Sequence, residues 1–484
     1  MIQGLMQRMS AWCLVLAVLL AGVLPLACHA EEDDRPPNVV VFFADDLGYA
    51  DLSCFGSERC ATPNLDRLAK NGARLTSFYV ASAACTPSRA ALMTGCYPVR
   101  VSMPQVIGPG SRVVLNHQET TIAEMLKPLG YATAAVGKWH LGDGPGNLPT
   151  DHGFDEYLGL PYSNDMWPFH YGDHDRGAIG NPNWPDLPLL DGHEAIELNP
   201  RQETLTPRYN ARALDFIERS KDRPFLLYYA HSHPHVPIAA SDTFKGKTGK
   251  GLYADMILEI DDSVGQVVAK LEELGLAQNT LIVFSSDNGP WEMFGDHAGE
   301  VGPLRGSKGM TFEGGMRVPF VAYWPGTIPA GTESDEVASA MDLLPTIAAI
   351  TGADLPDVTI DGHDIGPILR GEPGAVSPYD AFFYYYPAEL QAVRVGDWKL
   401  HVPHNHRTVP RIGNDGNPGR QGRGRIELSL YNLATDPGET TNLAEQHPEK
   451  VAELLEHIER ARTELGDSIT RRKGSGVRPP GRRE

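Results

Sequence analysis

Acidic and amide side chains follow two apolar segments of the chain and could together bind a hard metal cation. Asp45 and Asp46 come directly after one segment, and Asp287 and Asn288 come directly after the other. These residues offer oxygen ligands and no sulfur, a set that suits Ca²⁺ or Mg²⁺ much better than zinc. Aspartate and asparagine are also common turn residues where strands end. Because basic residues follow two further apolar segments, we favour a metal site over unrelated turns.

Lysine and histidine side chains follow those two further segments. Lys138 and His140 are two residues apart, so in an extended segment they would point the same way and could bind an oxyanion and move a proton. His231, His233 and His235 alternate after the other segment and could form a zinc patch. The other candidate ligands are oxygen donors, however, and the proline within His-Pro-His breaks the extended spacing. A general acid from this run fits better.

A cysteine stands where a helix is predicted to begin. Pro87 is typical of a first helical turn, and Gly95 is typical of a helix end. Cys85 would therefore lie at a helix N-terminus, where the helix dipole favours the anionic form of the thiol. Arg89, one turn further on, would be within reach of it. A lone cysteine without this setting would be interpreted as a buried structural residue.

The other cysteines of the mature chain do not indicate a zinc site. They are Cys54, Cys60 and Cys96, and no CxxC pair occurs. Cys54 and Cys60 are close enough to form a short-loop disulfide in an oxidising compartment.

Four continuous apolar runs predict the buried parallel strands that would position the polar residues. The runs cover residues 38–43, 132–136, 224–229 and 280–285. Helical patterns lie at 63–71 and near 120–129, 208–219, 253–275 and 338–350. Strands that alternate with helices predict a doubly wound α/β sheet, in which ligands bind outside the carboxyl ends of the strands. The candidate residues follow those ends.

The character of the sequence changes near residue 375. Short strand-like pieces at 381–386, 391–394, 398–401 and 427–432 precede a helical pattern at 448–465. They predict a small antiparallel sheet covered by one helix. We therefore expect a catalytic α/β domain at 36–375, a small α+β subdomain at 376–468 and a tail at 469–484. The tail is basic and contains two prolines, so we expect it to be disordered.

Residues 1–30 have the pattern of a secretory signal. Arg8 precedes an apolar run at 12–26, and small residues at 27–30 precede an acidic stretch. An uncleaved N-terminal anchor is the alternative, and Cys28 leaves open a lipid attachment, although the residues before it form a poor lipobox. No later stretch reaches roughly 18 apolar residues, so we expect no transmembrane segment. The pattern predicts a secreted or periplasmic protein.

The segment that begins at Cys85 matches a known signature, in which Cys-x-Pro-Ser-Arg and a downstream Thr-Gly direct conversion of the cysteine to Cα-formylglycine. On this segment the chain resembles the type I, formylglycine-dependent sulfatases, of the arylsulfatase A and N-acetylgalactosamine-6-sulfatase type. The similarity runs over nearly the whole mature chain and includes residues 45–49, 62–69, 137–142, 306–315 and 430–443. It implies an alkaline-phosphatase-like fold with a doubly wound, mixed or parallel sheet.

The resemblance also implies a role for each candidate residue. The ligands of Ca²⁺ would be Asp45, Asp46, Asp287, Asn288 and the modified Cys85. Arg89 would steady the formylglycine hydrate, and the sulfate would be surrounded by Lys138, His140, Ser163, His235 and Lys308. Ser163 departs most from the pattern, because relatives often have histidine in place of the Asn164 that follows it. His235 is chosen from its run because Val236-Pro237 follows it, as in the family.

The reaction that the resemblance implies explains these residue types. A thiolate that attacked sulfur would leave an adduct with no easy exit, whereas a geminal diol has a second hydroxyl to expel sulfate. One hydroxyl, activated by Ca²⁺ and Asp287, would attack sulfur. His235, helped by Lys308, would protonate the departing alcohol, and His140 would deprotonate the second hydroxyl. The basic residues would offset the charge of the sulfuryl oxygens.

We therefore predict a sulfuric ester hydrolase that acts on a sulfated glycan or another sulfate ester and is matured by a formylglycine-generating enzyme. One alternative is a phosphate or phosphonate ester hydrolase of the same fold, which would usually show threonine or serine as nucleophile and more histidine and aspartate ligands. A second is a catalytically silent protein that binds sulfated glycans, which would result if Cys85 is never modified.

Net charge excludes one class of partner and says little about the substrate. The chain has 62 acidic and 42 basic residues, a formal net charge of −20. Such a surface argues against nucleic acid, because neutralising phosphates needs clustered lysine and arginine. An anionic substrate remains compatible with it, because Arg89, Lys138 and Lys308 would gather locally around one sulfate.

Overall fold

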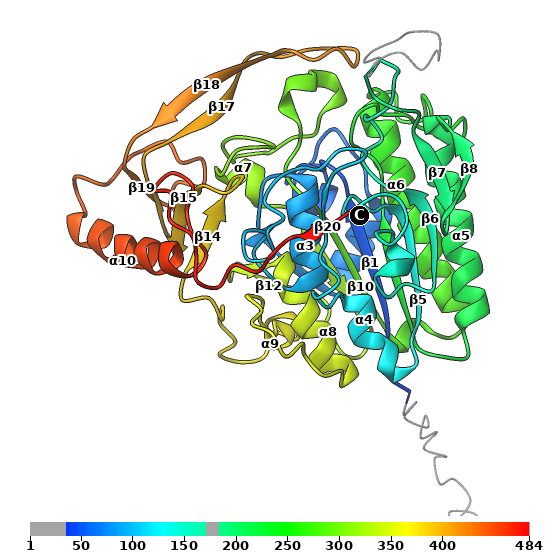
Figure 1. Cartoon of the computed structure of the whole chain (residues 1–484). Helices are drawn as coiled ribbons and strands as arrows, with labels where there is room; N and C mark the ends of the chain where they lie inside the picture. The colour runs from blue at the N-terminus through cyan, green and yellow to red at the C-terminus, as the bar shows by residue number, and fades with distance from the viewer. Residues whose placement is uncertain (1–34, 171–182, 484) are drawn as a thin grey trace, which may run out of the picture. The chain divides into compact units, whose positions relative to one another are not determined.

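Continuous apolar runs form the centre of a ten-stranded sheet in the computed structural model, which describes residues 35–170 and 183–483 (Figure 1). Four neighbouring parallel strands lie in the order β10 (Thr280–Ser286), β1 (Asn38–Ala44), β9 (Phe225–Ala230) and β5 (Ala132–Lys138). Every residue of these strands is buried, because helices cover both faces of the sheet. They are the four strands that the sequence predicted.

Shorter strands extend this parallel centre on both sides. On one side lie β6 (Glu156–Leu160), parallel to β5, and the antiparallel pair β7 (Pro188–Asp191) and β8 (Glu194–Leu198). On the other lie β11 (Phe320–Tyr323), β2 (Ala73–Leu75) and β12 (Thr332–Ser334). A separate parallel pair is formed by β3 (Phe78–Tyr79) and β13 (Ala338–Ser339). The sheet is therefore mixed, as expected.

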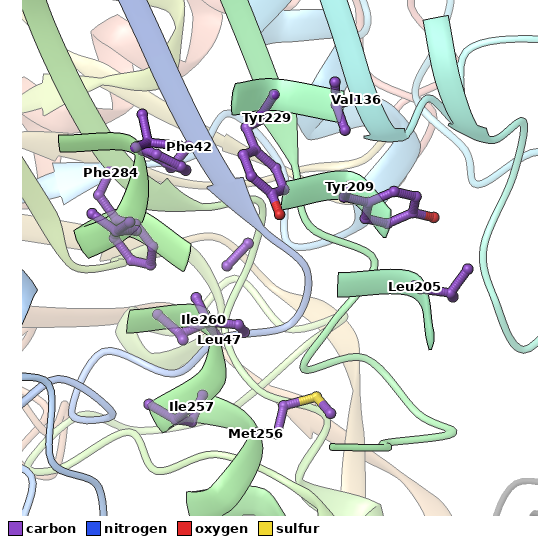
Figure 2. Close-up of a cluster of buried hydrophobic side chains, with 14 of the residues drawn as sticks. Phe42, Leu47, Val136, Leu205, Tyr209, Tyr229, Met256, Ile257, Ile260 and Phe284 are labelled. Carbon is purple, nitrogen blue, oxygen red and sulfur yellow. The ribbon is translucent and has the colours of Figure 1, made fainter. Parts of the chain in front are cut away.

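Alternate residues of the central strands pack into two cores, one on each face of the sheet. In one core, Val40 and Phe42 of β1 pack with α2 (Pro63–Asn71), α5 (Leu205–Ser220) and α6 (Leu252–Glu273) (Figure 2). In the other, Val39 and Val41 pack with α3 (Cys85–Thr94), α4 (Ile122–Leu126), α8 (Leu343–Thr351) and α9 (Gly366–Leu369). The doubly wound α/β architecture is confirmed.

The predicted small antiparallel sheet is also present. Its strand order is β14 (Phe382–Tyr385), β15 (Leu390–Val395), β16 (Trp398–His401) and β19 (Ser429–Asn432). Leu454 and Ile458 of α10 (Pro448–Glu464) cover this sheet in a core that also contains Tyr79 and Ala91 of the α/β part. The small sheet thus shares apolar packing with the α/β part, and Glu313 of the short helix α7 (Glu313–Met316) accepts hydrogen bonds from Tyr384 and Lys399 of the small sheet.

A long hairpin, β17 (His404–Arg411) and β18 (Arg420–Ile426), extends from the C-terminal sheet (Figure 1). Sequence patterns did not predict it, because its strands carry charged residues and glycines in place of alternating apolar side chains.

The C-terminal segment differs from the predicted disordered tail. Strand β20 (Gly481–Arg482) pairs antiparallel with β4 (Val113–Val114) of the α/β part. Arg478 forms an ion pair of 2.7 Å with the buried Glu119 and donates a hydrogen bond to the Thr359 carbonyl. Basic residues that looked unpaired along the sequence thus find acidic partners in space, which fix the segment.

Two further expectations concern cysteines and the N-terminus. Cys54 and Cys60 are free thiols in the structure, so the predicted disulfide is absent from it. Burial raises the pKa of both thiols to about 12, which keeps them neutral. The predicted signal at 1–30, with Cys28, lies outside the described residues. Within residues 35–170 and 183–483, no helix is long and apolar enough to cross a membrane.

Candidate active site

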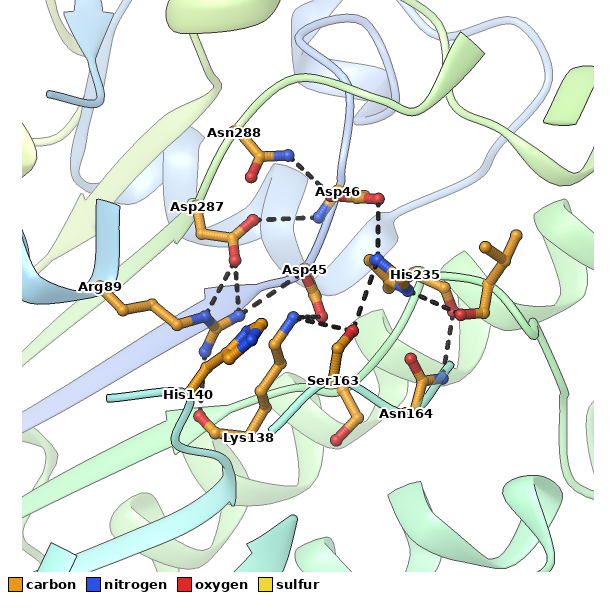
Figure 3. Close-up of polar contacts among 12 residues, drawn as sticks. Asp45, Asp46, Arg89, Lys138, His140, Ser163, Asn164, His235, Asp287 and Asn288 are labelled. Atoms are coloured by element: carbon orange, nitrogen blue, oxygen red, sulfur yellow. Dashed lines mark hydrogen bonds and ion pairs between the residues drawn. The ribbon is translucent and has the colours of Figure 1, made fainter. Parts of the chain in front are cut away.

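The polar residues predicted at the strand ends meet at one edge of the large sheet. Asp45 and Asp46 follow β1, Asp287 and Asn288 follow β10, and Lys138 ends β5 (Figure 3). All of them are almost completely buried. Parallel strands place their carboxyl ends together, which explains why residues far apart in sequence converge here.

Hydrogen bonds lock the ends of β1 and β10 to each other. The backbone amide of Asp46 donates to Oδ1 of Asp287 at 3.2 Å, and Nδ2 of Asn288 donates to Oδ1 of Asp46 at 2.7 Å. Asp46 adopts a left-handed backbone with φ of 64°, a conformation that aspartate tolerates better than most residues. The acidic residues are therefore held in fixed positions.

Each buried carboxylate has a basic partner. Lys138 Nζ lies 2.5 Å from Oδ2 of Asp45, and Lys308 Nζ lies 2.8 Å from Asp46. Arg89 contacts Oδ2 of Asp287 through Nε at 2.9 Å and through Nη2 at 2.7 Å. Charges this deeply buried are tolerated only when paired.

The basic partners do not affect all the carboxylates equally. Although burial opposes ionisation, the charges of Lys138, His235 and Arg89 hold the pKa of Asp45 well below its usual value. Burial and the neighbouring Asp45 carboxylate raise the pKa of Asp287 to about 7. The three carboxylates and the three basic side chains balance in formal charge, but Asp287 is held less firmly in its ionised form than Asp45.

Cys85 lies at the first position of α3, as predicted, but its thiol is not anionic. Burial raises the pKa of Cys85 to about 12, and the charges of Lys138 and Lys308 only partly oppose this effect. The expectation that the helix dipole would favour a thiolate is therefore wrong for the unmodified residue, because desolvation outweighs the dipole. A neutral, buried thiol is a weak nucleophile.

His140 lies beside Lys138 and Arg89, but not through an extended backbone (Figure 3). Its φ of 63° turns the chain after β5, so the premise that Lys138 and His140 point the same way along a strand is wrong. Nε2 lies 2.8 Å from the Ile107 carbonyl oxygen, and Nδ1 has no hydrogen-bond partner among the described residues. Burial and Lys138 lower the pKa of His140 well below its usual value, so this imidazole is neutral.

The structure separates His235 from the other histidines of its run. His235 Nε2 lies 3.5 Å from Oδ2 of Asp46 and 3.5 Å from the hydroxyl of Ser163, while its Nδ1 lies 2.6 Å from the Val236 carbonyl oxygen. The Ser163 hydroxyl also accepts a hydrogen bond of 3.2 Å from Lys138, so Ser163 belongs to the cluster. His231 instead stacks on Tyr229 in the core, where burial lowers its pKa to about 3. No shared zinc patch results.

The structure brings together side chains that could hold a metal ion. Ligand atoms of Asp45, Asp46, Cys85 and His235 all lie within 4.8 Å of one another. Oδ1 of Asp45 and Oδ1 of Asn288 are buried without a hydrogen-bond partner among the described residues. Buried oxygens of this kind are unfavourable unless a ligand satisfies them. His235, which the sequence assigned to proton transfer, belongs to this set of ligand atoms. Asp287, which was predicted to be a ligand, forms an ion pair with Arg89 instead.

Sequence reasoning missed an aromatic residue that contacts two of the predicted ones. The Trp291 ring lies 5.4 Å from the His235 ring, and Lys308 Nζ lies 4.3 Å from its centroid. Tryptophan binds cations through its ring face, so Trp291 helps to place both side chains. Its position four residues after Asp287 was the only available signal in the sequence.

Family comparisons agree with this geometry. Residues 37–353 match the sulfatase family model, and residues 377–475 match the model of the C-terminal region of aryl-sulfatase. Arylsulfatase A of Homo sapiens is 41% identical over 470 residues, which cover 90% of this chain and 89% of that protein. N-acetylgalactosamine-6-sulfatase of Canis lupus familiaris is 37% identical over 461 residues, which cover 89% of this chain and 85% of that protein.

A solved structure shows the same fold. The PsFucS1 sulfatase from Pseudoalteromonas sp. superposes with a TM-score of 0.79 at 30% identity, covering 88% of this chain and 90% of that chain. Matches of this extent, on a chain whose signature cysteine lies within a buried cluster of carboxylates and cations, lead to one conclusion. The protein belongs to the sulfatase family, with its alkaline-phosphatase-like α/β fold, and is a sulfuric ester hydrolase.

Proposed function

We propose that this sulfatase cleaves its ester with a formylglycine at position 85 and a Ca²⁺ ion bound beside it. The single observation that carries the proposal is the place of Cys85, at a helix start among buried cations and next to buried oxygens that accept no hydrogen bond among the described residues. Asp45, Asp46, Asp287, Asn288 and residue 85 would hold the ion, which supplies a Lewis acid for the sulfuryl oxygen. Oxygen-rich sites of this kind favour Ca²⁺ over zinc.

The chemistry of Cys85 supports its modification. A thiol with a pKa raised to about 12 is protonated at neutral pH and cannot act as an efficient nucleophile. The hydrated aldehyde would supply the attacking hydroxyl in its place, and a formylglycine-generating or equivalent enzyme would install it. Maturation has to precede folding, because the Cys85 side chain is 2% exposed in the folded chain.

The basic residues bind and orient the sulfate group. Lys138 and Lys308 carry fixed charges next to Cys85, and Arg89 fixes Asp287 by two contacts. Cations in a site that excludes water stabilise developing negative charge far more than exposed ones do. We assign to Lys138 and Lys308 the neutralisation of the sulfuryl oxygens, and to Arg89 the positioning of residue 85 and Asp287.

We assign proton transfers in opposite directions to two histidines. His235 lies between the Asp46 carboxylate and the Ser163 hydroxyl, where it can protonate the departing alcohol. His140 is held neutral by burial and has a free Nδ1 among the described residues, so it can accept a proton from residue 85. Ser163, linked to both Lys138 and His235, would orient the sulfate between them.

We further propose a sulfated glycan as substrate and export as the destination. The relative N-acetylgalactosamine-6-sulfatase is named for a sulfated sugar. The N-terminal pattern of Arg8, an apolar run and small residues is that of a secretory signal, which would deliver the enzyme to the periplasm or the exterior.

Peptide mass spectrometry tests the modification. Trypsin releases residues 75–89, which contain Cys85 as their only cysteine. We expect the mass of this peptide to correspond to formylglycine in active preparations, and we expect Cys85→Ala to abolish hydrolysis of sulfate esters. An active enzyme whose peptide carries only cysteine would overturn the proposal. Unmodified cysteine without activity would instead favour the silent glycan-binding alternative, and a preference for phosphate over sulfate esters would favour the phosphatase alternative.

A further inference from the structure

The hairpin of β17 and β18 carries a concentration of positive charge that the catalytic cluster does not use. Residues 404–426 contain five arginines and one acidic residue, in a chain whose formal net charge is −20. The arginines are Arg407, Arg411, Arg420, Arg423 and Arg425. Local charge of the sign opposite to the rest of the surface indicates an electrostatic partner rather than a general solubility effect.

Most of these arginines have no acidic partner. Arg425 forms an exposed ion pair of 2.6 Å with Glu427. Within the described part of the chain, no ion pair reaches Arg411, Arg420 or Arg423, and all three are exposed. Gly422 and Gly424 separate the arginines along β18, so the guanidinium groups stand without bulky neighbours on that strand. The hairpin therefore presents uncompensated positive charge to solvent.

The hairpin is anchored at both ends and so acts as a fixed arm. At its base, Ile426 packs with Met310, Phe312 and other apolar residues. At its far end, the backbone amides of Gly413 and Gly419 both donate to the Met293 carbonyl, at 3.0 and 2.7 Å. Met293 belongs to the short helix η6 (Glu292–His297) that follows the active-site strand β10. The arm thus spans from the C-terminal sheet to the loop beyond Asn288.

The middle of the arm lies next to the active site. Arg407 packs so closely on Gly309 that a Cβ at Gly309 would approach its Nη1 to 2.8 Å. The Arg407 guanidinium also lies 5.5 Å from the centroid of the Tyr386 ring, whose hydroxyl experiences the charges of both Arg407 and Lys308. Gly309 is the residue after Lys308, so positive charge continues from the sulfate-binding lysine onto the arm.

We propose that this arginine arm binds further sulfate groups of a polyanionic substrate, so that the enzyme acts on sulfated polysaccharides or their longer fragments. The inference rests on the proposed function and extends it to the substrate beyond the cleaved ester. A sulfated chain repeats its charges along its length, and a row of guanidinium groups bonds sulfate oxygens as it bonds other oxyanions. A small ester would occupy the buried cluster alone and would not reach the exposed arginines.

The test compares two triple variants with equal loss of charge. R411Q/R420Q/R423Q neutralises the arm, and K70Q/K221Q/K245Q neutralises three exposed lysines outside it. Hydrolysis of 4-nitrophenyl sulfate is measured with dextran sulfate as a polyanionic inhibitor and with sodium sulfate as a small one. We expect the arm variant to raise the inhibition constant of dextran sulfate at least tenfold, to change that of sodium sulfate less than twofold, and to reduce the salt dependence of polyanion inhibition.

The outcomes separate this proposal from the proposed function. If the inhibition constant of dextran sulfate changed less than twofold in the arm variant, or changed equally in the lysine variant, the proposal that the arm binds polyanions would be wrong. Elution of the folded proteins from immobilised dextran sulfate by a salt gradient tests binding without turnover, and the arm variant should elute at lower salt than the lysine variant. A wild-type protein without turnover on any sulfate ester would contradict the proposed function, and the elution order would still decide whether the arm binds polyanions.

Discussion

Two buried charge clusters in this molecule use similar residues for different ends. The active-site cluster joins Asp45, Asp46 and Asp287 to Lys138, Lys308 and Arg89 at the ends of parallel strands. The second cluster, which we call the interdomain cluster, lies where the small sheet meets α7 and β3 of the α/β part. It contains Glu313, Glu439, Lys399, His401, Tyr79 and Tyr384. Both are almost completely inaccessible to solvent.

The clusters differ in how completely their oxygens are satisfied. In the interdomain cluster, Glu313 accepts hydrogen bonds from Tyr79 at 2.5 Å, Tyr384 at 3.1 Å and Lys399 at 2.9 Å. Glu439 accepts from the Glu313 amide at 2.8 Å and lies 3.0 Å from Lys399, and every carboxylate oxygen of this pair therefore has a partner. In the active site, by contrast, Oδ1 of Asp45 and Oδ1 of Asn288 accept no hydrogen bond among the described residues, although Nη2 of Arg89 lies 3.8 Å from Oδ1 of Asp45.

This difference indicates that the interdomain cluster holds structural elements together, whereas the active-site cluster can bind a ligand. A network of buried charges whose carboxylate oxygens all have partners fixes the relative position of the elements that carry it. A buried network that leaves oxygens without a hydrogen bond can be completed by a ligand that donates one or by a cation. Burial and charge alone, which the clusters share, would not have distinguished them.

The largest expected effect comes from breaking the active-site cluster. Asp45→Asn removes the charge of the carboxylate that faces Lys138 and whose Oδ1 accepts no hydrogen bond among the described residues. We expect kcat/KM for a sulfate ester to fall about a thousandfold, as when one electrostatic contact to a transition state is removed. Asp342→Asn is the control, because that buried carboxylate accepts hydrogen bonds from Ser339, His363 and Tyr379 away from the site. Comparable activity losses in the two variants would remove the functional distinction.

Breaking the interdomain cluster should instead cost stability. Lys399→Met leaves the buried carboxylates of Glu313 and Glu439 without their shared cation, and we expect the free energy of unfolding to fall by about 3–5 kcal/mol. Urea unfolding followed by fluorescence measures it. Lys221→Met, which removes an exposed partner of Glu218, should leave the unfolding midpoint unchanged. A Lys399→Met variant as stable as the wild type would show that the network is not needed to hold the sheets together.

A metal titration sharpens the comparison further. A ligand that binds only the folded state stabilises it by about 2.7 kcal/mol at a hundred times its dissociation constant. We expect added Ca²⁺ to raise the melting temperature of wild-type protein and of Lys399→Met, and a chelator to reverse the change. Asp46→Asn should lose the response, because Asp46 belongs to the ligand set. If Asp46→Asn kept the full response, the cation would bind elsewhere.

The sequence predicted the parts of the molecule whose local pattern is repeated and strong. The four central strands are continuous apolar runs buried on both faces, so their positions and their strand-end residues could be identified from the sequence pattern alone. The convergence of Asp45 and Asp287 followed from the geometry of parallel strands. Lys308 and Ser163 came from family resemblance, because neither lies at a predicted strand end.

The remaining features depend on contacts that a sequence pattern does not contain. The hairpin β17–β18 lacks apolar alternation and is fixed by packing at its base and backbone bonds at its tip. The C-terminal segment looked disordered because its arginines had no acidic neighbours in sequence, whereas Glu119 lies more than three hundred residues away along the chain. The sequence wrongly predicted an anionic Cys85 thiol. The helix dipole follows from the local sequence, whereas the burial that raises the pKa of the thiol depends on the packing of the whole chain.

A third kind of buried polar group tests whether missing partners alone define a site. His152 is fully buried, stacks on His117 at 4.5 Å, and forms no hydrogen bond at either ring nitrogen among the described residues. Burial lowers the pKa of His152 to about 3, so the ring is neutral in the folded state. A neutral ring without hydrogen bonds carries no charge that could attract a cation. His152 differs in this respect from the Asp45 carboxylate.

The pH dependence of stability should reveal this neutral histidine. An unfolded histidine titrates near pH 6.5, whereas folded His152 titrates near 3, so between these values the unfolded state binds more protons and stability falls as the pH falls. From pH 7 to pH 5 we expect His152 to cost about 2 kcal/mol. His152→Phe, which retains the stacking on His117, should unfold with a shallower loss over this range, whereas exposed His447→Gln should match the wild type. Equal slopes in all three proteins would mean that His152 is protonated in the folded state over this range. The distinction between its neutral ring and the charged Asp45 carboxylate would then not hold.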